Sequence, residues 1–532
     1  MADPPDTYSL HREIIQSLLE KTQDLDKQVV NRVKNDVCGK YNLGDIPSNA
    51  DILQDTVGEE RETLLEVLQK RPVRTVSGVA VVATMTKPHP CPHGKCAYCP
   101  GGPDVGVPQS YTGHEPATMR GIQNDFDPYR QVIGRLAQLE ATGHSTNKVE
   151  LIVMGGDWCS KSNEYREEFV KGCLDGMNGK RSKNLEEAKE RNETSARRNV
   201  GITFETRPDM VTPENIDDML QFGATRVEIG VQTLSNEILE YVDRGHSTRE
   251  TALATQLLRD SGLKVCYHLM PGLPGSTLKG DLEVFDKIFQ DEQYRPDMLK
   301  VYPTIVVKNT KLYDWWKNGE YEPYSTEEMV ALISKVVSKM PKYVRIQRMQ
   351  RDIPLHQVEA GLDKGNLREL VHKRMKEEDL RNPTIRYREI GHFQMRNDTD
   401  IHPDSIKLVR RDYRASHGQE VFLSYEATEL DVIFGFLRLR LPSTNAHRPE
   451  LSDDTAIIRE LRVYGPVVDI GDRNSDAWQH LGFGEEMVEQ SEKISRDEFG
   501  VGRLAVNSGI GVKPYYRNLG FQDDGPYLVK SL

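Results

Sequence analysis

The sequence has few cysteines and no long apolar run. Only 7 of its 532 residues are cysteine, an odd number, and four of them are scattered, which argues against a disulfide framework. No apolar stretch approaches the roughly 20 residues that cross a bilayer. The opening "MADPPDTYSLHREIIQ" has no apolar core or cleavage signal, so a cytoplasmic protein is expected. The scattered cysteines are predicted to be small buried apolar residues: Cys38, Cys159, Cys173 and Cys266.

An excess of positive charge is also missing. The chain has 82 acidic and 70 basic residues and a formal net charge of -12. Its surface as a whole is therefore not a nucleic-acid platform, because phosphate binding needs local positive potential. Four basic clusters do occur, and each is expected to be a solvated face more often than an RNA site. They are "KRPVR" from Lys70, "HKRMK" from His372, "RRDYR" from Arg410 and "RLRL" from Arg438.

The chain is too long for one hydrophobic core, so two or three domains are expected. Residues 1–75 are predicted to be helical. Residues 76–380 alternate apolar strands with amphipathic helices, which predicts an α/β fold with βαβ units and a largely parallel sheet or partial barrel. Residues 381–532 begin with a linker and continue as a mixed α/β sheet. The predicted strands lie in "GVAVVATM", "VELIVMGG", "VGITFET", "ATRVEIGVQ", "LKVCYHLM", "MLKVYPTIVV", "LVRRDYRA", "EVFLSYEA", "DVIFGFLRLRL", "AIIRELRVYG" and "RLAVNS".

The other three cysteines are close together. Cys91, Cys96 and Cys99 have the spacing C-x4-C-x2-C in a loop rich in Gly and Pro, directly after a predicted strand. Structural zinc usually takes four protein ligands, often as two separated pairs, and no second pair follows; His93 is an alternative fourth ligand without the usual spacing. An iron–sulfur cluster held by three cysteines would leave one iron open. The spacing therefore favours a cluster with a vacant coordination site.

Such a cluster in the first loop of a βα barrel resembles that of the radical S-adenosylmethionine (radical SAM) enzymes. In that superfamily the open iron of a [4Fe-4S] cluster chelates S-adenosylmethionine, and reductive cleavage gives a 5′-deoxyadenosyl radical. The usual spacing in that superfamily is C-x3-C-x2-C. The longer first gap here departs from it and restricts the families within the superfamily to which the chain can belong.

The sequence around these cysteines is similar to that of the catalytic acetyltransferase subunit of Elongator, in the archaeal or bacterial form with short cysteine spacing. The resemblance covers nearly the whole chain after the first helical segment. It implies an N-terminal tRNA-binding segment in residues 1–75, a radical SAM barrel in 76–380, and a linker with a GNAT-type acetyltransferase domain in 381–532. The motifs that carry it are "MTKPHPCPHGKCAYCPGGP", "QSYTGHEPATMR", "ETRPD", "RVEIGVQT", "RGHST", "KVYPT", "IQRMQRDIP", "GNLREL", "ELRVYGPVV" and "YYRNLGF".

Within the barrel, the resemblance implies that strand ends hold S-adenosylmethionine. Gly155 and Gly156 would let the backbone approach its amino group, although "GGDW" departs from the usual "GGTF". The cofactor's ribose and carboxylate would be gripped by Glu205 and Arg207, with Gln232 nearby. The alternatives are an ordinary tight turn for the two glycines and structural ion pairs or hydrogen bonds for the other three residues.

A second motif, "QHLGFGE", resembles the acetyl-CoA loop of the GNAT acetyltransferases. Its glycines would expose amide groups at a helix N-terminus, which favours a pyrophosphate. Tyr515 and Tyr516 lie in "YYRNLGF", where the family places a tyrosine near the thioester; their alternative role is packing in the core. The candidate acetyl-CoA residues are Gln479, His480, Leu481, Gly482, Phe483 and Gly484.

The resemblance implies one combined reaction. Acetyl-CoA would supply an acetyl unit, a radical would form on its methyl carbon, and carbon-5 of the wobble uridine of tRNA would become carboxymethylated. Lys300 and Tyr302 are candidate substrate contacts in the radical pocket, with Tyr313 and Lys264 as weaker candidates. The anticodon stem-loop would bind partly through charges of the first segment, without readout of sequence: Arg32, Lys34, Lys40, Lys70, Arg71 and Arg74.

Two other functions remain open: a protein lysine acetyltransferase whose barrel is structural, and a non-catalytic RNA-binding scaffold. Further Elongator-like subunits or self-association are compatible with the sequence. The family often has linker cysteines that resemble a small zinc site, whereas "LRNPTIRYREIGH" has none. We therefore expect no zinc in the linker, which must be held by packing or hydrogen bonds.

Overall fold

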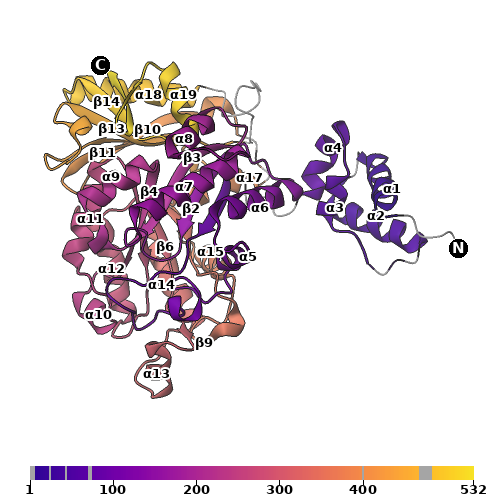
Figure 1. Ribbon diagram of the computed structural model, residues 1–532, viewed down its shortest axis with the longest axis horizontal. Coiled ribbons are helices and arrows are strands. Elements are labelled where there is room, and N and C mark those ends of the chain that lie inside the picture. Colours follow the sequence, from indigo (N-terminus) through magenta and orange to yellow (C-terminus); the bar gives the residue numbers. More distant parts are fainter. Residues whose placement is uncertain are drawn as a thin grey trace.

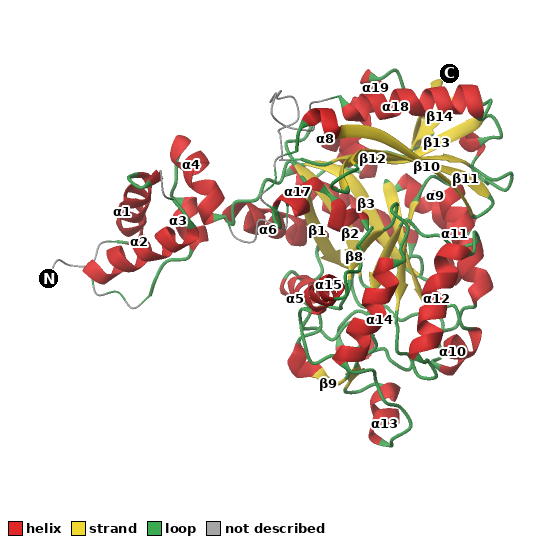
Figure 2. Cartoon of the chain, turned by 180° about the vertical axis from the view of Figure 1, so that it is seen from behind, coloured by secondary structure: helices red, strands yellow, loops and turns green. Residues whose placement is uncertain are grey.

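The computed structural model describes residues 6–22, 25–41, 43, 45–69, 75–397, 399, 401–465 and 482–532. Within them, four N-terminal helices stand to one side of a body built from two sheets (Figure 1). The second sheet caps one end of the first, and α13 (Lys311–Lys317) projects at the opposite end (Figures 1 and 2). None of the described helices is long and apolar enough to span a membrane.

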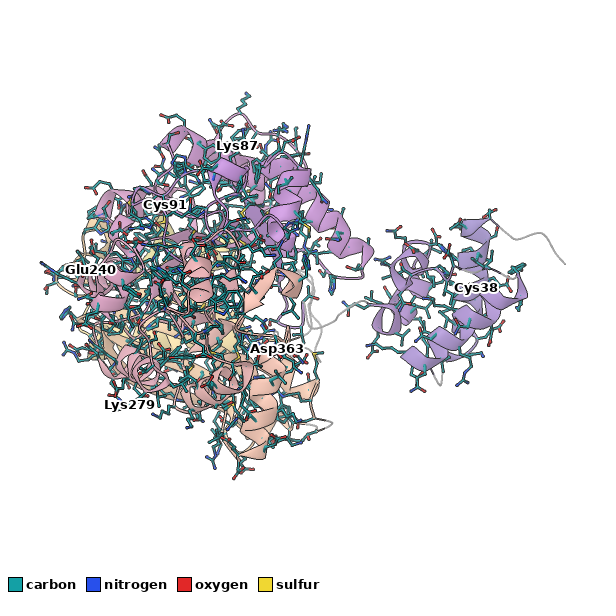
Figure 3. The ribbon with its side chains drawn as sticks, turned by 90° about the horizontal axis from the view of Figure 1, so that it is seen from below. Cys38, Lys87, Cys91, Glu240, Lys279 and Asp363 are labelled. Atoms are coloured by element: carbon teal, nitrogen blue, oxygen red, sulfur yellow. The ribbon has the colours of Figure 1, made fainter. Side chains whose placement is uncertain are left out.

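The N-terminal helices have a core of their own. It contains Ile14, Val33, Ile52 and Leu64, and it is separate from the core of the main body. Figure 3 shows this unit, marked by Cys38, apart from the body that carries Cys91. The unit contacts the end of α6 (Pro128–Ala141), for example through Gln69, whose amide donates to the Gly143 carbonyl at 2.9 Å. The helices are α1 (Thr7–Leu19), α2 (Lys27–Lys40), α3 (Asn49–Gln54) and α4 (Glu59–Leu68).

The first sheet has seven strands in the order β1-β2-β3-β4-β5-β6-β8, all parallel. This confirms the predicted parallel α/β architecture. Helices pack on its outer face, among them α6 on β1 and α11 (Thr248–Asp260) on β5. The strands are β1 (Ala80–Met85), β2 (Lys148–Met154), β3 (Arg198–Thr206), β4 (Ala224–Gln232), β5 (Lys264–Leu269), β6 (Met298–Val301) and β8 (Arg345–Arg348).

The sheet does not close into a full barrel. In the described part of the chain, β1 and β8 are its two edge strands, so the structure is a half-barrel whose carboxyl ends meet at one rim. A small ladder of β7 (Val306–Val307) and β9 (Val358–Ala360) lies apart from it. The remaining helices of this part are α5 (Pro116–Gln123), α7 (Asn163–Asn178), α8 (Leu185–Glu193), α9 (Pro213–Gln221), α10 (Asn236–Tyr241), α12 (Leu278–Gln290), α14 (Thr326–Ser338) and α15 (Leu367–Glu377).

The second sheet is mixed, as predicted, with the order β10-β11-β12-β13-β14-β16-β15. Its one parallel pair, β13 with β14, is short: β14 pairs only with Thr455–Ile458, whereas β13 continues to Val463 beside β12. The two strands therefore splay apart. The elements are β10 (Ile406–Ala415), β11 (Gly418–Ala427), β12 (Val432–Leu441), β13 (Thr455–Val463), β14 (Arg503–Val506), β15 (Gln522–Asp524), β16 (Tyr527–Ser531), α18 (Phe483–Lys493) and α19 (Lys513–Asn518).

A fully buried ionic network joins the two sheets. Asp297, at the start of β6, receives both terminal nitrogens of Arg459 from β13 at 2.8 Å. Arg459 also bonds Glu420 of β11 at 2.7 Å, and Glu420 bonds Arg259 of the barrel at 2.7 Å. All four side chains are 0% exposed. Buried charges are tolerated only when they are paired in this way.

The "RLRL" cluster from Arg438 belongs to this network, so the expected solvated face is wrong there. Arg438 and Arg440 are both fully buried. Arg440 bonds Asp260 at 2.6 Å and Glu420 at 2.9 Å, while Arg438 bonds Glu460 at 2.9 Å. The partners are far away in the sequence, so a local reading of the pattern could not find them.

The linker contains two short helices, α16 (Ile385–Arg388) and α17 (Ile390–Gln394). Between them Glu389 is fully buried, pairs with Arg345 and accepts from the Ser77 hydroxyl at 2.5 Å. Arg388 contacts Glu426 at 2.6 Å. Ion pairs and hydrogen bonds thus hold this segment against both sheets.

Candidate functional site

The three-cysteine loop lies at the carboxyl rim of the half-barrel, after β1. Backbone hydrogen bonds fix its centre: Ala97 donates to Val242 at 3.0 Å and accepts from Leu312 at 2.9 Å. Cys96 and Cys99 are buried, and Cys91 is partly exposed. The four other cysteines are buried, as predicted.

Polar groups surround the thiols. The Gln109 amide donates to the Cys99 sulfur at 3.1 Å, and the Ser110 hydroxyl lies 3.1 Å from the same sulfur. His93 Nε2 is 3.2 Å from the Cys96 sulfur. Burial, followed by the neighbouring Cys99, raises the pKa of Cys91 to about 11. Cys91 is therefore close enough to its neighbour to interact with it and is protonated near pH 7, so binding of a metal cluster would release its proton.

Cys91 and Cys96 line a cavity of ≈ 340 Å³, here called the thiol cavity, whereas Cys99 is not among its lining residues. Two polar atoms at its wall, Asp157 Oδ2 and Gln232 Oε1, are buried without a hydrogen-bond partner among the described residues. Such orphaned groups indicate a polar ligand, because an unmade buried hydrogen bond is costly. Three thiols beside unpaired polar atoms fit a cluster with a polar cofactor. Of the predicted residues, the lining includes Cys91, Cys96, Gly156, Glu205, Arg207, Gln232 and Tyr302.

Gly155 belongs to the turn after β2, and the space that a side chain at this position would occupy is crowded. Its φ is +125°, and an added Cβ would lie 2.2 Å from Thr86 Oγ1. We expect Gly155→Ala to lower the free energy of unfolding by roughly 3 kcal/mol, from backbone strain plus overpacking. Gly179→Ala is the control, since Gly179 has φ +68° and nothing within 4 Å; it should cost about 1 kcal/mol. Equal losses in denaturant titrations would contradict the crowding argument.

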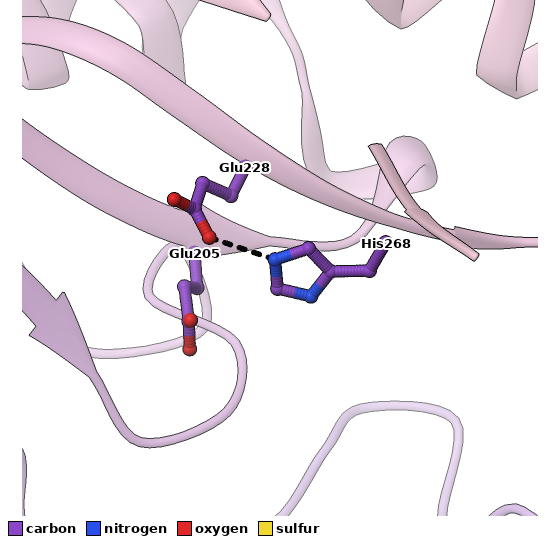
Figure 4. Close-up of side chains that lie close together, drawn as sticks. All are labelled: Glu205, Glu228 and His268. Atoms are coloured by element: carbon purple, nitrogen blue, oxygen red, sulfur yellow. Dashed lines mark hydrogen bonds and ion pairs between the residues drawn. The ribbon is translucent and has the colours of Figure 1, made fainter. Parts of the chain in front are cut away.

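Charged side chains cover the inner face of the strands below this rim. Glu205, Glu228 and His268 lie within 4.8 Å of one another (Figure 4). His268 Nε2 is 2.7 Å from Glu228, and Lys300 pairs with Glu228 and lies 3.5 Å from Glu205. The Lys300 ammonium thus supplies the cation for this trio, and together with His268 it holds the pKa of Glu228 well below its usual range despite burial.

Several predicted residues lie elsewhere or have other partners. Arg207 bonds Asp209 at 2.8 and 3.0 Å and the Arg244 and Gly245 carbonyls, so its guanidinium already fixes the neighbouring loop. Tyr313, on α13, packs beside the cysteine loop and does not line the cavity. Lys264 begins β5 and lines a different cavity, so its placement in the radical pocket is wrong.

That second cavity, ≈ 1110 Å³, is bounded by both sheets and is here called the interdomain cavity. It lies where β13 and β14 splay, facing the amino ends of β2, β3 and β5 through Lys148, Arg198 and Lys264. The two cavities therefore lie at opposite ends of the same parallel strands.

The second predicted motif lies at the interdomain cavity. Gly482 caps α18 with φ +78°, and Gly482 and Gly484 line the cavity with Tyr515 and Tyr516. The Tyr515 hydroxyl would lie 3.0 Å from a Cβ on Gly484, so it faces the amino end of α18. Phe483 stacks on Tyr425 at 4.2 Å and is not among the lining residues. Gln479, His480 and Leu481 lie outside the described residues.

Among the N-terminal cations, Lys34 does not match the prediction. It is only 7% exposed, bonds Asn49 at 2.9 Å, and burial lowers its pKa. Lys40 pairs with Glu13 at 2.8 Å, whereas Arg32 is exposed. Lys70, Arg71 and Arg74 lie outside the described residues.

Some site residues were not predicted from the sequence, namely Gln109, Ser110, Glu228 and His268. For Glu228 a signal exists: it shares one face of β4 with Arg226 and Gln232, and charge inside an otherwise apolar strand indicates a polar lumen. The contacts of Gln109 and Ser110 with Cys99 depend on a loop fold that no local pattern indicates.

Comparison with known proteins places the chain in a family. It matches the family models for the ELP3 N-terminal domain (residues 8–76), the Radical SAM superfamily (89–288) and the Radical_SAM C-terminal domain (296–377). It is 48% identical to the tRNA uridine(34) acetyltransferase of Methanocaldococcus infernus, over 98% of this chain and 99% of that protein. It is 44% identical to Elongator complex protein 3 of Drosophila melanogaster, over 98% and 95%.

A solved structure agrees. The structure of the archaeal Methanocaldococcus infernus Elp3 with an N-terminal deletion (1–46) is 45% identical to this chain, with a TM-score of 0.77. The match covers 86% of this chain and 100% of that one. Membership of the radical SAM superfamily implies a [4Fe-4S] cluster and S-adenosylmethionine, which agrees with the chemistry of the thiol cavity. The chain belongs to the family of tRNA uridine(34) acetyltransferases and Elongator complex protein 3.

Proposed function

We propose that this protein is a tRNA-modifying enzyme that uses acetyl-CoA and radical SAM chemistry to place a carboxymethyl group on carbon-5 of the wobble uridine. The observation that carries the proposal is the pair of cavities at opposite ends of one parallel sheet. One is lined by two thiols of the three-cysteine loop, and the other by a glycine-capped helix and two tyrosines. The names of relatives at 48% identity support the tRNA substrate.

In the thiol cavity, Cys91, Cys96 and Cys99 would hold the cluster, which when bound supplies the electron that cleaves S-adenosylmethionine. Gly156 would allow close approach of that cofactor's amino group. Glu205 and Gln232 would accept hydrogen bonds from it, and the partnerless Gln232 oxygen supports this role. Tyr302 lines the same cavity and would contact the base.

In the interdomain cavity, the amino end of α18 at Gly482 and Gly484 would bind the pyrophosphate of acetyl-CoA. Tyr516 is almost fully buried and would support the ring of Tyr515, at 5.1 Å between centroids. Burial raises the pKa of Tyr515 to about 12. Tyr515 is therefore a protonated phenol near pH 7, suited to donate to the departing CoA thiolate rather than to act as a base.

Tyr515→Phe is expected to lower acetyl-CoA cleavage by about 10²-fold, because it removes this donor and preserves the ring. CoA thiol release in the presence of tRNA measures the effect. Tyr413→Phe is the control, since its hydroxyl is buried, has no hydrogen-bond partner among the described residues and lies outside both cavities. The rate of this variant should stay within about 2-fold of the wild type. A Tyr515→Phe enzyme as fast as that control would remove the proposed donor.

The anticodon stem-loop would reach the thiol cavity past four arginines of its lining: Arg120, Arg135, Arg348 and Arg351. Such cations neutralise phosphates without reading sequence. A wobble base in a flexible loop can leave its stack at modest cost and enter a pocket.

The decisive experiment is mass spectrometry of wobble nucleosides after anaerobic incubation with tRNA, dithionite, acetyl-CoA and S-adenosylmethionine. Carboxymethyluridine should appear only in the complete mixture. Acetylation of protein lysines without any change in tRNA would instead favour a protein acetyltransferase.

A further inference from the structure

The two cavities are separated by one layer of side chains. Arg226 of β4 lines the interdomain cavity, and Glu228, two residues further along the strand, lines the thiol cavity. Residues i and i+2 of a strand share a face and are roughly 7 Å apart. The partition inside the half-barrel is therefore about one side-chain layer thick.

That layer is an unbroken chain of opposite charges. From the interdomain side, Arg462 lies 3.8 Å from Glu150, and Glu150 pairs with Arg226. Arg226 Nε lies 3.4 Å from Glu228 Oε1, and Glu228 pairs with Lys300 at the thiol side. Despite burial, Arg226 and Arg462 lower the pKa of Glu150 to about 2, so the chain stays ionised at neutral pH.

The contact between Arg226 and Glu228, where the chain of charges crosses from the lining of one cavity to the lining of the other, is weak. Neither Arg226 Nε nor Glu228 Oε1 has a hydrogen-bond partner in the described structure, and their separation of 3.4 Å is long for an ion pair. The terminal nitrogen of Arg226 is instead held by Glu150. Rotation of Arg226 toward Glu150 would therefore break no hydrogen bond to Glu228.

We propose that the Arg226–Glu228 contact is a gate. The two-carbon unit, released as acetate when water attacks the thioester carbonyl and the CoA thiol leaves, passes between the cavities through the lumen of the half-barrel at this point. The inference rests on the proposed function, which needs the methyl carbon of an acetyl group bound at one end of the strands to meet a radical formed at the other. Both residues act by positioning, since they open or close the passage and leave the reacting bonds to other groups.

Ile152 offers a way to block this passage. It is on β2 midway between Glu150, which lines the interdomain cavity, and Met154, which lines the thiol cavity. The alternating burial of β2 places all three side chains on one partly exposed face. An aromatic ring at this position would fill the lumen without removing a charge, so Ile152→Phe is the blocking variant. Ile152→Leu, of equal volume, is its control.

The first test measures opening of the lumen without catalysis. Cys266 lies at the level of Glu228 in the strand register, and Cys173 lies outside the lumen on α7; both are 0% exposed. In the full-length protein, alkylation by iodoacetamide is followed by peptide mass spectrometry. We expect Cys266 to react at least about 5-fold faster than Cys173, and Ile152→Phe to bring the two rates together. Equal rates in the wild-type protein would overturn the gate.

The second test follows the two-carbon unit with acetyl-CoA deuterated on its methyl group. In the wild type and in Ile152→Leu, deuterium should appear in 5′-deoxyadenosine, because a C–D bond of the methyl group breaks as a C–D bond of 5′-deoxyadenosine forms. Ile152→Phe should reduce this transfer at least about 10-fold, with CoA release and CoA affinity by calorimetry unchanged. Undiminished transfer in a folded Ile152→Phe protein would overturn the passage. Absence of modified uridine in the wild type would instead refute the proposed function.

Discussion

Replacing Cys96 with alanine is expected to abolish uridine modification, with a loss on the order of 10³-fold or more. Cys96 belongs to the three-cysteine loop, lines the thiol cavity and is nearly buried, so no other side chain replaces it easily. Radical formation has no substitute among protein side chains. Iron and sulfide content after anaerobic reconstitution, the electron paramagnetic resonance spectrum and the wobble nucleosides measure the effect.

The matched control is Cys173→Ala, which removes an equally buried thiol from α7, outside both cavities. It should keep full cluster content and cost only about 1 kcal/mol of stability. CoA release by Cys96→Ala should also persist, because the interdomain cavity lies at the other end of the strands. Normal carboxymethyluridine from Cys96→Ala would refute the assignment of the cluster to this loop.

Replacing Asp297 with asparagine is expected to lower the free energy of unfolding by about 3–5 kcal/mol. The Asp297 carboxylate is the shared partner of three buried cations: Arg459 at 2.8 Å, and Arg259 and Arg438 at 3.5 Å. Loss of its charge leaves these three buried guanidinium groups with only Glu420 and Glu460 as anionic partners. Denaturant titration followed by circular dichroism measures the effect.

Asp286→Asn is the control for Asp297→Asn, since Asp286 forms a half-exposed pair with Lys339 at 2.9 Å. Exposed pairs contribute about 0–1 kcal/mol. The three arginines hold the pKa of Asp297 well below its usual range despite burial. An aspartate whose pKa is depressed in the folded protein stabilises the fold at pH values above its pKa in the unfolded chain, about 3.9. This stabilisation is lost as the pH falls from about 3.9 through the pKa of the folded protein. The difference between wild type and Asp297→Asn should therefore shrink only below about pH 4.

The stretches that form strands were predictable from the sequence where the pattern was strong. Those of β1 to β6 and β10 to β14 each formed a strand. Most of them are apolar runs, because burial on both faces of a covered sheet requires such runs, whereas β10 is largely exposed or half-buried. Four short strands, β8, β9, β15 and β16, and the helix α19 were not predicted. Strand β8 reads "RIQR", and its residues are stabilised by tertiary partners such as Glu389 rather than by local propensity.

The position of the candidate site was more predictable than the residues that surround it. The cysteine spacing and the glycine motif each identified one cavity, because their chemistry depends on residues close in sequence. The separation of the cavities, the ionic partition and the interface arginines depend on pairs such as Arg440 with Asp260, 180 positions apart. Lys34 and Lys264 were misassigned for the same reason, since their surroundings are set by packing of distant segments.

The unclosed edge of the first sheet has a consequence for the size of what the protein can act on. A fully closed barrel admits only molecules small enough to pass between the loops above its mouth. Here Val81, on the edge strand β1, is 42% exposed and lines the thiol cavity together with Arg135 of α6. A single unit carried by a bulky folded polymer can thus be presented sideways, while the rest of that polymer stays outside.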